Sequence, residues 1–490
     1  MAWQQEAGIT SRSDLVNHMV SFLTSQHVAT VAVNAGGTGY TDNDILTLTH
    51  AGAHLDAKFE ATVASGVITA LRIVSGGAFS NRPNGTITVT AGGTGYSASR
   101  SDIVLELAGG TSRCPAKVLA TTNGSGVVTS AVAFEDLGTA ALGSYSVLPS
   151  YPAATTVQGP DGFQTGSGCT ITMSGSTGLI GTTALTVTGG TGSGATVNIT
   201  LAETGWTVDG RNGNHRTHNS VINEKEVTLK GDATGWTNKP FVTLITATET
   251  SGLNTRNAVA FVGQIANNPA LEVHEQTTRG PGVSGASSLV DGGCYLLCPE
   301  DSGSGPGAIE LWINGDEFSF TGQVQLDENA AVSDNGIYLD FYAGMMDRFG
   351  TETDSPAPML VGASSRTINV DPTVGSTSIT SIVEQRHTGT GCYVAYDHVG
   401  GVWRSIQNDD TAGTPSAEDM IVFPVGELFQ NGGDDQIVSE GPWTIFEDIF
   451  ELDRSSAVRV LRKIPGTTPE FFLWPLIVTR KPRSPPADVN

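Results

Sequence analysis

An internal duplication constrains the fold of this chain more than any other feature of its sequence. Residues 33–40 read VNAGGTGY and residues 89–96 read VTAGGTGY, so a glycine-rich stretch ending in tyrosine occurs twice. Three further matches follow both copies in the same order, at offsets of 56 to 60 residues: 44–48 with 102–107, 57–59 with 116–118, and 65–69 with 125–129. Ordered matches at one offset indicate a repeated structural unit.

Each copy has the pattern of a small β module. Short runs of alternating apolar and polar residues are separated by glycines, which allow the positive φ angles of tight turns. We expect β-sandwich or β-roll modules at about residues 30–88 and 89–150, and a third, degraded copy at about 151–203 whose closing turn is the glycine-rich stretch 188–192. A phosphate-binding loop is the alternative for these glycines, but neither Lys-Ser/Thr nor a helical pattern follows them.

The composition of the chain agrees with a β-rich fold. Of its 490 residues, 61 are glycine and only 15% are charged, a balance typical of sheets joined by many tight turns. Hydrophobic residues make up 38% and occur in short alternating runs, which argues against disorder. The predicted fold class is mainly β.

One helix is predicted, at residues 14–25. Ser11, Ser13 and Asp14 are candidates for its N-cap, and the apolar residues that share one face are Leu15, Met19, Phe22 and Leu23. We expect residues 1–26 to belong to a β-sandwich-like core and the helix to pack around Trp206, not on the repeats.

The sequence changes character after residue 204, where tryptophans and acidic residues become frequent. We predict a β-rich core over residues 204–480, with a subdomain boundary near 365, and a polar tail at 481–490. Strands are expected at 227–230, 241–245, 258–262, 309–313, 317–320 and 470–480. The Asn-Gly pair within residues 313–316 predicts a hairpin turn.

Six motifs in this second part occur in a characteristic order. They are Gly-Trp-Thr-Val at 205–208, a strand ending in Val-Gly at 259–263, Trp-Ile-Asn-Gly at 312–315, Tyr-Ala-Gly at 342–344, a proline-rich turn at 356–362, and an aromatic strand at 443–450. In this order they resemble a family of structural proteins of bacteriophage tails. The resemblance covers about half the chain, from Gly205 to about Arg454.

The resemblance implies a virion component that assembles with other phage tail proteins, as a homo-oligomer, and that is not an enzyme. In the family the leading helix and the Gly-Trp element are adjacent, whereas here residues 27–203 lie between them. We therefore expect the repeats to be an inserted arm, because insertions are tolerated where two chain ends meet at a surface.

The net charge of −24 limits the partners of the chain. An acidic protein repels phosphate backbones, so nucleic-acid binding is not expected. An acidic surface could bind calcium, but no Asp-x-Asp-x-Asp loop is present, which favours a solvated surface. Neither a signal peptide nor a membrane span is predicted, so the expected localisation is the virion after synthesis in the host cytoplasm.

No metal site or cofactor is predicted. The five cysteines are scattered and odd in number, which indicates small buried residues and not a disulfide framework. Cys294 and Cys298 have no second ligand pair nearby, and His215 and His218 lie in a polar stretch without helical pattern.

Catalysis is not expected either. The adjacent carboxylates at 409–410, 434–435 and 447–448 would point to opposite faces of a strand, so no pair could flank one glycosidic bond. A Gly-x-Ser-x-Gly elbow with an ordered acid and histidine after it is also missing from the sequence.

Glycan binding is the main alternative to a purely structural role. Aromatic rings can stack on sugars, and the candidates are Tyr40, Tyr96 and Trp403. The competing interpretation, which we favour, is that the tryptophans lie in the core and the repeat tyrosines anchor turns. Three functions remain open: a structural component of the tail tip, baseplate or collar; an adhesin for a host receptor or glycan; and a capsid decoration protein.

Overall fold

The computed structural model is mainly β, with antiparallel sheets and, among the residues it describes, one helix. The described residues are 2–9, 12–51, 53–101, 103–133, 143–149, 153–158, 166–178, 180–212, 216–218, 221–224, 226–251, 254–269, 276, 278, 282–283, 290–291, 294–298, 309–326, 338–345, 359–363, 365–366, 392–397, 402–407, 426–429, 436–439, 443–444, 458–463 and 470–475. The predicted fold class is confirmed.

The chain forms two compact units. The first unit contains residues 1–232, 268–272 and 310–317, and the second contains residues 233–267, 273–309 and 318–490. Trp206 and the repeats therefore belong to the same compact unit as the N-terminal helix.

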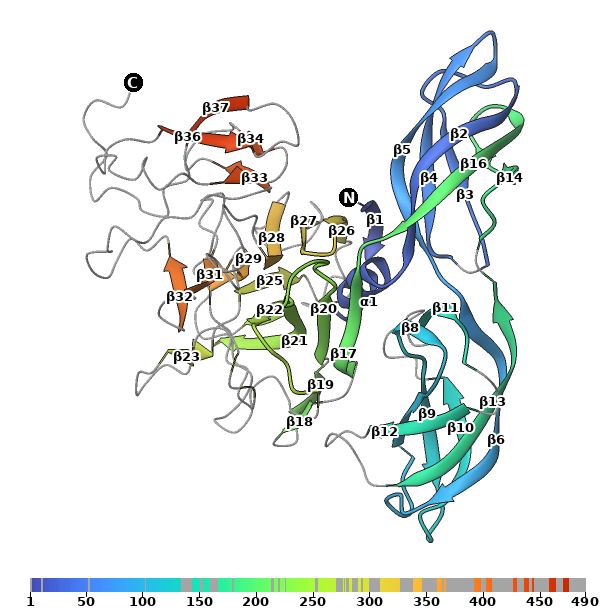
Figure 1. Cartoon of the computed structure of the whole chain (residues 1–490), viewed down its shortest axis with the longest axis vertical. Coiled ribbons are helices and arrows are strands. Elements are labelled where there is room, and N and C mark those ends of the chain that lie inside the picture. The colour runs from blue at the N-terminus through green and yellow to red at the C-terminus, as the bar shows by residue number, and fades with distance from the viewer. Residues whose placement is uncertain are drawn as a thin grey trace. The chain divides into compact units, whose positions relative to one another are not determined.

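The first module of the first unit is a seven-stranded sheet with the order β14-β16-β2-β5-β4-β3-β15 (Figure 1). Its edge strands, β14 and β15, are separated by a single residue, so the two edges of the sheet meet and the sheet is nearly closed. The strands are β2 (Gln26–Thr38), β3 (Ile45–Leu48), β4 (Ala53–Ala64), β5 (Val67–Phe79), β14 (Leu185–Thr186), β15 (Thr188–Gly189) and β16 (Ser193–Glu203).

The second module is a six-stranded sheet with the order β10-β9-β7-β12-β13-β6. In this sheet β12 pairs with both β7 and β13. In the first module the same place is taken by two short strands, β15 beside β3 and β14 beside β16. The first strand β6 contacts β10, just as β2 contacts β5 in the first module. The two modules therefore share one circular strand order. The strands are β6 (Arg82–Thr94), β7 (Ile103–Leu107), β9 (Lys117–Thr122), β10 (Val128–Ala133), β12 (Ala153–Gln158) and β13 (Ser167–Thr177), beside the hairpin of β8 (Thr111–Cys114) and β11 (Ser144–Val147).

These sheets divide the chain differently from the three consecutive modules that the repeats predicted. The segment 151–203 is not one module, because β13 pairs with β6 of the second module and β16 pairs with β2 of the first. In Figure 1 the green β16 lies beside the dark-blue β2. In each module the last strand of the sequence pairs with the first strand. For the first module this last strand is β16, which follows the whole of the second module in the sequence. The second module, residues 82–177, is therefore inserted between β5 and β14.

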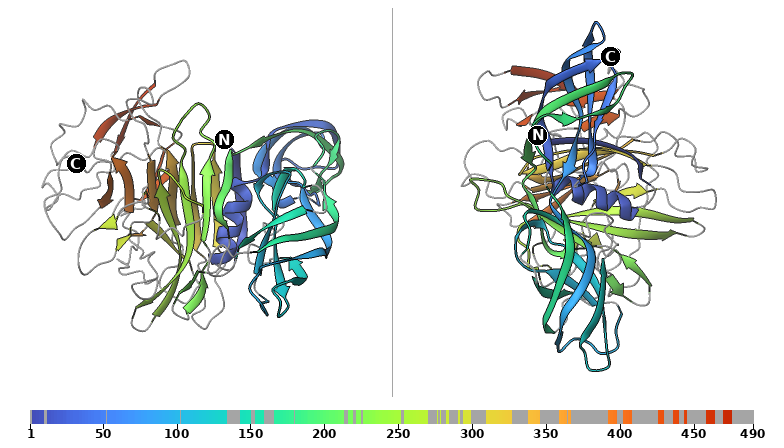
Figure 2. Two further views of the ribbon diagram at one scale, coloured as in Figure 1. Left: turned by 60° about the horizontal axis from the view of Figure 1, so that its bottom comes forward. Right: turned by 90° about the vertical axis from the view of Figure 1, so that its right-hand side faces the viewer.

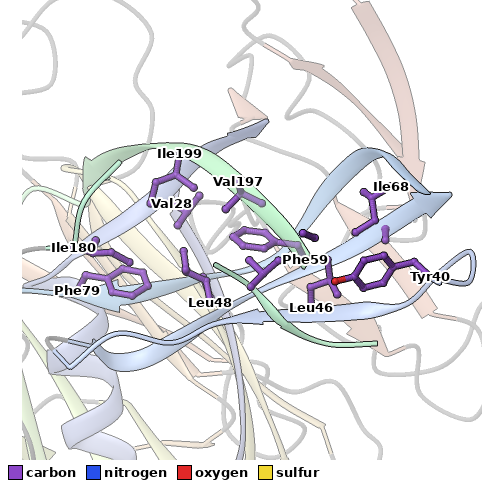
Figure 3. Packing of buried hydrophobic residues seen from close by; sticks show 14 residues of the cluster. Val28, Tyr40, Leu46, Leu48, Phe59, Ile68, Phe79, Ile180, Val197 and Ile199 are labelled. Atoms are coloured by element: carbon purple, nitrogen blue, oxygen red, sulfur yellow. The ribbon is translucent and has the colours of Figure 1, made fainter. Parts of the chain in front are cut away.

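Each module has its own apolar core. In the first, inward side chains of every long strand converge, with Tyr40 at one end of the cluster and Phe79 and Ile180 at the other (Figure 3). A separate cluster fills the second module and includes Tyr96, Ile171 and Met173. Burial of each large apolar side chain stabilises the fold by roughly 1.5 to 3 kcal/mol, so each module has a substantial core.

The helix α1 (Arg12–Leu23) begins and ends two residues before the predicted limits. Its predicted apolar face is buried, with Leu15, Met19, Phe22 and Leu23 all inaccessible to solvent. We expected this face to pack around Trp206, whereas the contacts of α1 include β4 and β5 of the first module and β1 (Ala2–Ile9). Figure 2 shows α1 as a coiled ribbon near the N-terminus.

Three side chains from outside the helix lie against carbonyl groups at the end of α1. The ring Nε2 of His27 lies 2.6 Å from Phe22 O, the Thr204 hydroxyl donates to Leu23 O, and the Ser144 hydroxyl donates to Thr24 O at 2.6 Å. Terminal helix carbonyls need such partners. Gln26 and Glu203 are cross-strand neighbours, so the two ends of segment 27–203 meet at the end of this helix.

The remaining strands of the first unit follow or flank the modules. Trp206 lies in β17 and is fully buried, and its indole Nε1 donates to Asp316 O at 2.7 Å. The predicted Asn-Gly turn is displaced, because β26 runs through Gly315 and the next strand begins at Ser319. These strands are β17 (Trp206–Asn212), β18 (Arg216–His218), β19 (Val221–Glu224), β20 (Glu226–Gly231) and β26 (Ile309–Gly315), whose first residue falls in the second unit.

An aromatic cluster lies in the core of the second unit. Phe261 stacks on Phe341 with ring centroids 5.2 Å apart, and Phe320 packs against both rings. The strands are β21 (Phe241–Ser251), β22 (Asn254–Gln264), β23 (Gly282–Val283), β24 (Val290–Asp291), β25 (Cys294–Cys298), β27 (Ser319–Leu326), β28 (Tyr338–Met345), β29 (Met359–Ala363), β30 (Ser365–Arg366), β31 (Cys392–Asp397), β32 (Val402–Gln407), β33 (Gly426–Phe429), β34 (Gln436–Ser439), β35 (Trp443–Thr444), β36 (Val458–Lys463) and β37 (Glu470–Pro475). In the described part of the chain, no helix has the length and apolar character that crossing a membrane requires.

Candidate functional site

The two repeat tyrosines lie inside the modules. Tyr40 and Tyr96 are each only 5% exposed, and their amides donate to Gly66 O and Gly126 O at 3.1 and 3.3 Å. The Tyr96 hydroxyl also accepts a hydrogen bond from the Cys169 amide at 3.3 Å. Neither ring presents a face on which a sugar could stack, so both side chains act as turn anchors.

The other predicted candidates give no described site. Trp403 lies in β32, but its side chain is outside the described residues, as are His215 and the acid pairs at 409–410, 434–435 and 447–448. Cys114 and Cys169 are free and buried. Within the described residues, no three His, Cys, Asp or Glu side chains gather in an arrangement that could hold a metal ion.

A row of hydroxyl groups covers the outer surface of β6 and β13 in the second module. The inward residues of β6, Ile87 and Val89, pack on the core, while the residues between them point outward. We name this surface the second hydroxyl face, and it consists of Thr86, Thr88, Thr90, Thr170, Thr172 and Ser174.

Cross-strand hydrogen bonds fix this second hydroxyl face. The hydroxyl oxygens of Thr90 and Thr170 are 2.6 Å apart, and the Thr86 amide donates to the Ser174 hydroxyl at 2.8 Å. The central residues Thr88 and Thr172 lie opposite each other in the register. The hydroxyls are therefore held in two aligned rows on a rigid sheet.

The first module carries an equivalent surface on β2 and β16. The first hydroxyl face consists of Thr30, Ala32, Asn34, Thr196, Asn198 and Thr200. Thr30 and Thr200 place their hydroxyl oxygens 2.7 Å apart, and the Asn34 amide group donates to the Thr196 hydroxyl at 2.9 Å. These pairs occupy the positions of Thr86–Ser174 and Thr90–Thr170, so both modules keep the same outward chemistry.

Neither hydroxyl face contains a charged or aromatic residue. Between Asp161 and Glu203 the sequence has no Asp, Glu, Lys, Arg or His at all, although the chain as a whole has a net charge of −24. On β4 and β5 of the first module, by contrast, Glu60 and Arg72 form a surface ion pair. The first hydroxyl face therefore differs in charge from the surface of β4 and β5 in the same module.

A second feature of the first unit is a cleft of about 420 Å³ beside Arg113. The Arg113 guanidinium donates to Glu203, to Asp232 at 3.1 Å and to Trp206 O at 3.4 Å. Burial lowers the pKa of Arg113, but its carboxylate partners outweigh burial and raise the pKa above its ordinary value. Arg113 comes from the second module, so it joins that module to Glu203 and Asp232 beside Trp206, while Gln26 of the first module also donates to Glu203 at 3.4 Å.

His27 is buried where the first module meets α1. Its two ring nitrogens face the carbonyl oxygens of Gly77 and Phe22. Burial lowers the pKa of His27, while the two carbonyl groups and Glu203 raise it. The effect of burial is the larger, and the resulting pKa is about 4. A neutral imidazole donates from only one ring nitrogen, so His27 hydrogen-bonds one of these two carbonyl oxygens at a time. Its role is structural, at the junction of β2, β5 and the end of the helix.

Sequence reasoning missed the hydroxyl faces, although the alternation of threonine with apolar residues in 86–90 and 170–173 was a usable signal. No family model matches the chain, no curated protein matches its sequence, and no solved structure matches its fold.

Proposed function

We propose that this chain is a structural component of a bacteriophage tail, at its tip, baseplate or collar, that assembles with other tail proteins as a homo-oligomer. The resemblance in the order of six sequence motifs supports the proposal. In the described residues these motifs fall on strands, and their side chains Trp206, Phe261, Ile313 and Tyr342 are buried. Motif residues that build a core support a structural role for these motifs.

The observation that carries the proposal furthest is the way the modules are attached. Segment 27–203 leaves and returns at neighbouring positions, Gln26 and Glu203, beside the end of α1. An insertion whose ends meet can be added to a particle protein without disturbing the rest of its fold. This arrangement suits an arm carried by an assembled structural protein.

Immunogold electron microscopy of virus particles from the source culture tests the proposal, with antibodies against residues 27–203. We expect gold at the tail. Label on the head would instead favour a capsid decoration protein, and particles without label would contradict a virion role altogether.

Attachment to a host glycan is the second candidate function, and a specific observation favours it. The two hydroxyl faces are uncharged and equivalent, and their side chains are exposed on β2 and β6 and exposed or half-buried on β13 and β16. A purely structural arm does not require this surface chemistry. A binding experiment that uses this surface separates the two functions, because a tail component without glycan affinity would still be labelled on the particle.

A further inference from the structure

We propose that the two hydroxyl faces bind an uncharged polysaccharide that lies along the strands. The proposal rests on the second candidate function, attachment to a glycan, and does not depend on where in a particle the chain resides. The rings of Tyr40 and Tyr96 are buried and cannot contact a glycan. The proposed contacts are instead the threonine, serine and asparagine side chains on β2, β16, β6 and β13.

The spacing of the polar groups suits a repeating ligand. Residues that share one face of a strand are about 6.7 Å apart, and neighbouring strands are about 4.8 Å apart. On the second hydroxyl face this produces two parallel rows of hydroxyls around the central pair Thr88 and Thr172. Each hydroxyl has one donor and two acceptor positions, so a hydroxyl already paired across the strands still has capacity for a sugar hydroxyl.

The absence of charge from these faces determines the class of ligand. Phosphate polymers and acidic glycans need lysine or arginine, and neither face contains one. The net charge of −24 would repel such polymers as well. A neutral, polyhydroxylated chain exchanges hydrogen bonds with threonine and asparagine without any such penalty.

A protein partner is not the occupant that this chemistry favours. Protein interfaces depend on buried aromatic or large apolar anchors surrounded by a polar rim. On the hydroxyl faces the outward side chains are threonine, serine, asparagine and one alanine, Ala32. These small polar groups give many weak hydrogen bonds and no anchor, which suits a polymer that contacts many of them at once.

Because the module is duplicated, the chain carries two hydroxyl faces and could bind one polymer at two places. Each face alone should bind weakly, because it lacks an aromatic platform for stacking. A polymer that engages both faces gains avidity without any new type of contact, since its second binding event is intramolecular. We therefore expect affinity to increase with polymer length.

Affinity electrophoresis of the full chain tests the proposal. Native gels contain a soluble neutral glucan, galactan or mannan, and matched gels contain heparin or polygalacturonate as charged polymers. We expect retardation by at least one neutral polymer and by neither charged polymer. No retardation by any of the neutral polymers would overturn the proposal, as would equal retardation by the charged ones.

Variants locate the site. Thr88→Val together with Thr172→Val removes two hydroxyls and keeps the side-chain shape, and should weaken retardation at least fivefold. Thr62→Val, at an exposed position of β4 outside both faces, is the matched control and should behave like the wild type. Unchanged retardation in the double variant would place binding elsewhere and refute the assignment.

A folding defect is distinguished by a second variant. Thr88→Ser with Thr172→Ser restores the hydroxyls and should restore retardation, while a merely structural effect of the valines would appear as a lower melting temperature. If binding fails in the wild type while tail labelling succeeds, the glycan proposal is wrong and the structural proposal stands.

Discussion

At the scale of single residues, the equivalent glycines Gly37 and Gly93 are two positions that tolerate no side chain. Their φ angles are +61° and +62°, and a Cβ atom on either would collide with the backbone of the closing strand, at Ser193 and Ser167. Replacement by alanine adds both backbone strain and overpacking. We predict that Gly37→Ala and Gly93→Ala each lower the free energy of unfolding by about 2 to 4 kcal/mol.

Denaturant unfolding of each variant measures this effect. Gly178→Ala is the control, because its φ is not in the left-handed region and a Cβ there would meet nothing within 4 Å. Equal stabilities of Gly37→Ala and Gly178→Ala would show that the closing strand does not pack on Gly37 as described.

His27 makes the stability of the first unit depend on pH. Its pKa is about 4 in the folded chain and 6.5 ordinarily, so the unfolded chain takes up the proton first as the pH falls. The contribution of His27 to stability is fully present above pH 6.5, decreases between pH 6.5 and 4, and is fully lost below pH 4. The loss should be roughly 3 kcal/mol over this range.

Melting temperatures between pH 7 and 4 test the role of His27. His27→Gln should be less stable than the wild type at pH 7 and should have a smaller pH dependence below pH 6.5. His50→Gln removes a histidine that is only partly buried and should keep most of the wild-type dependence. A steep decrease that persists in His27→Gln would assign it to other groups.

At the scale of strands, the sequence predicted the elements better than their partners. The strands β20, β21 and β22 lie where alternation predicted them, and the duplicated glycine-rich stretches fall at the equivalent ends of β2 and β6. The closing strands β13 and β16 were assigned to a third module, because strand alternation does not reveal which distant strand is the neighbour. Pairing over such separations depends on tertiary packing, which the local pattern does not contain.

The candidate site was harder to predict, for a related reason. Tyr40, Tyr96 and Trp403 were selected for the chemistry of their rings, but binding also requires exposure, and the fold buries both tyrosines. Thr88 and Thr172 attract no notice in the sequence, since threonine is common in strands. They become a candidate surface only when the register places them opposite each other.

Arg113 connects two strands that are distant in sequence, β8 and β16. We predict that Arg113→Met, which keeps much of the aliphatic stem, lowers stability by about 1 kcal/mol, because the partly exposed partners Glu203 and Asp232 are screened by solvent. Thermal melting of Arg113→Met, Asp232→Asn and the double variant measures the coupling. Purely additive effects would mean that the ion pair with Asp232 contributes nothing.

At the scale of the whole molecule, the nested order of the modules has a consequence for deletion. The second module, residues 82–177, leaves the first after Phe79 and returns before Ile180, and both residues lie in the core cluster of the first module (Figure 3). A short linker should therefore span the gap. The closing strand β16 is different, because it contributes Ala195, Val197 and Ile199 to that same core.

Two deletions in the full chain test this nested arrangement. Replacing residues 82–177 with about six glycine and serine residues should leave a cooperative melting transition for the first module, at a lower temperature because contacts such as Ser144 to Thr24 O and Arg113 to Glu203 are lost. Replacing residues 180–203 in the same way should abolish that transition, since the sheet loses its last strand and part of its core. If the modules instead followed one another along the chain, residues 180–203 would not belong to the first module, and their removal would leave it folded. Calorimetry with limited proteolysis decides between the two, because a folded first module protects residues 26–79 from cleavage.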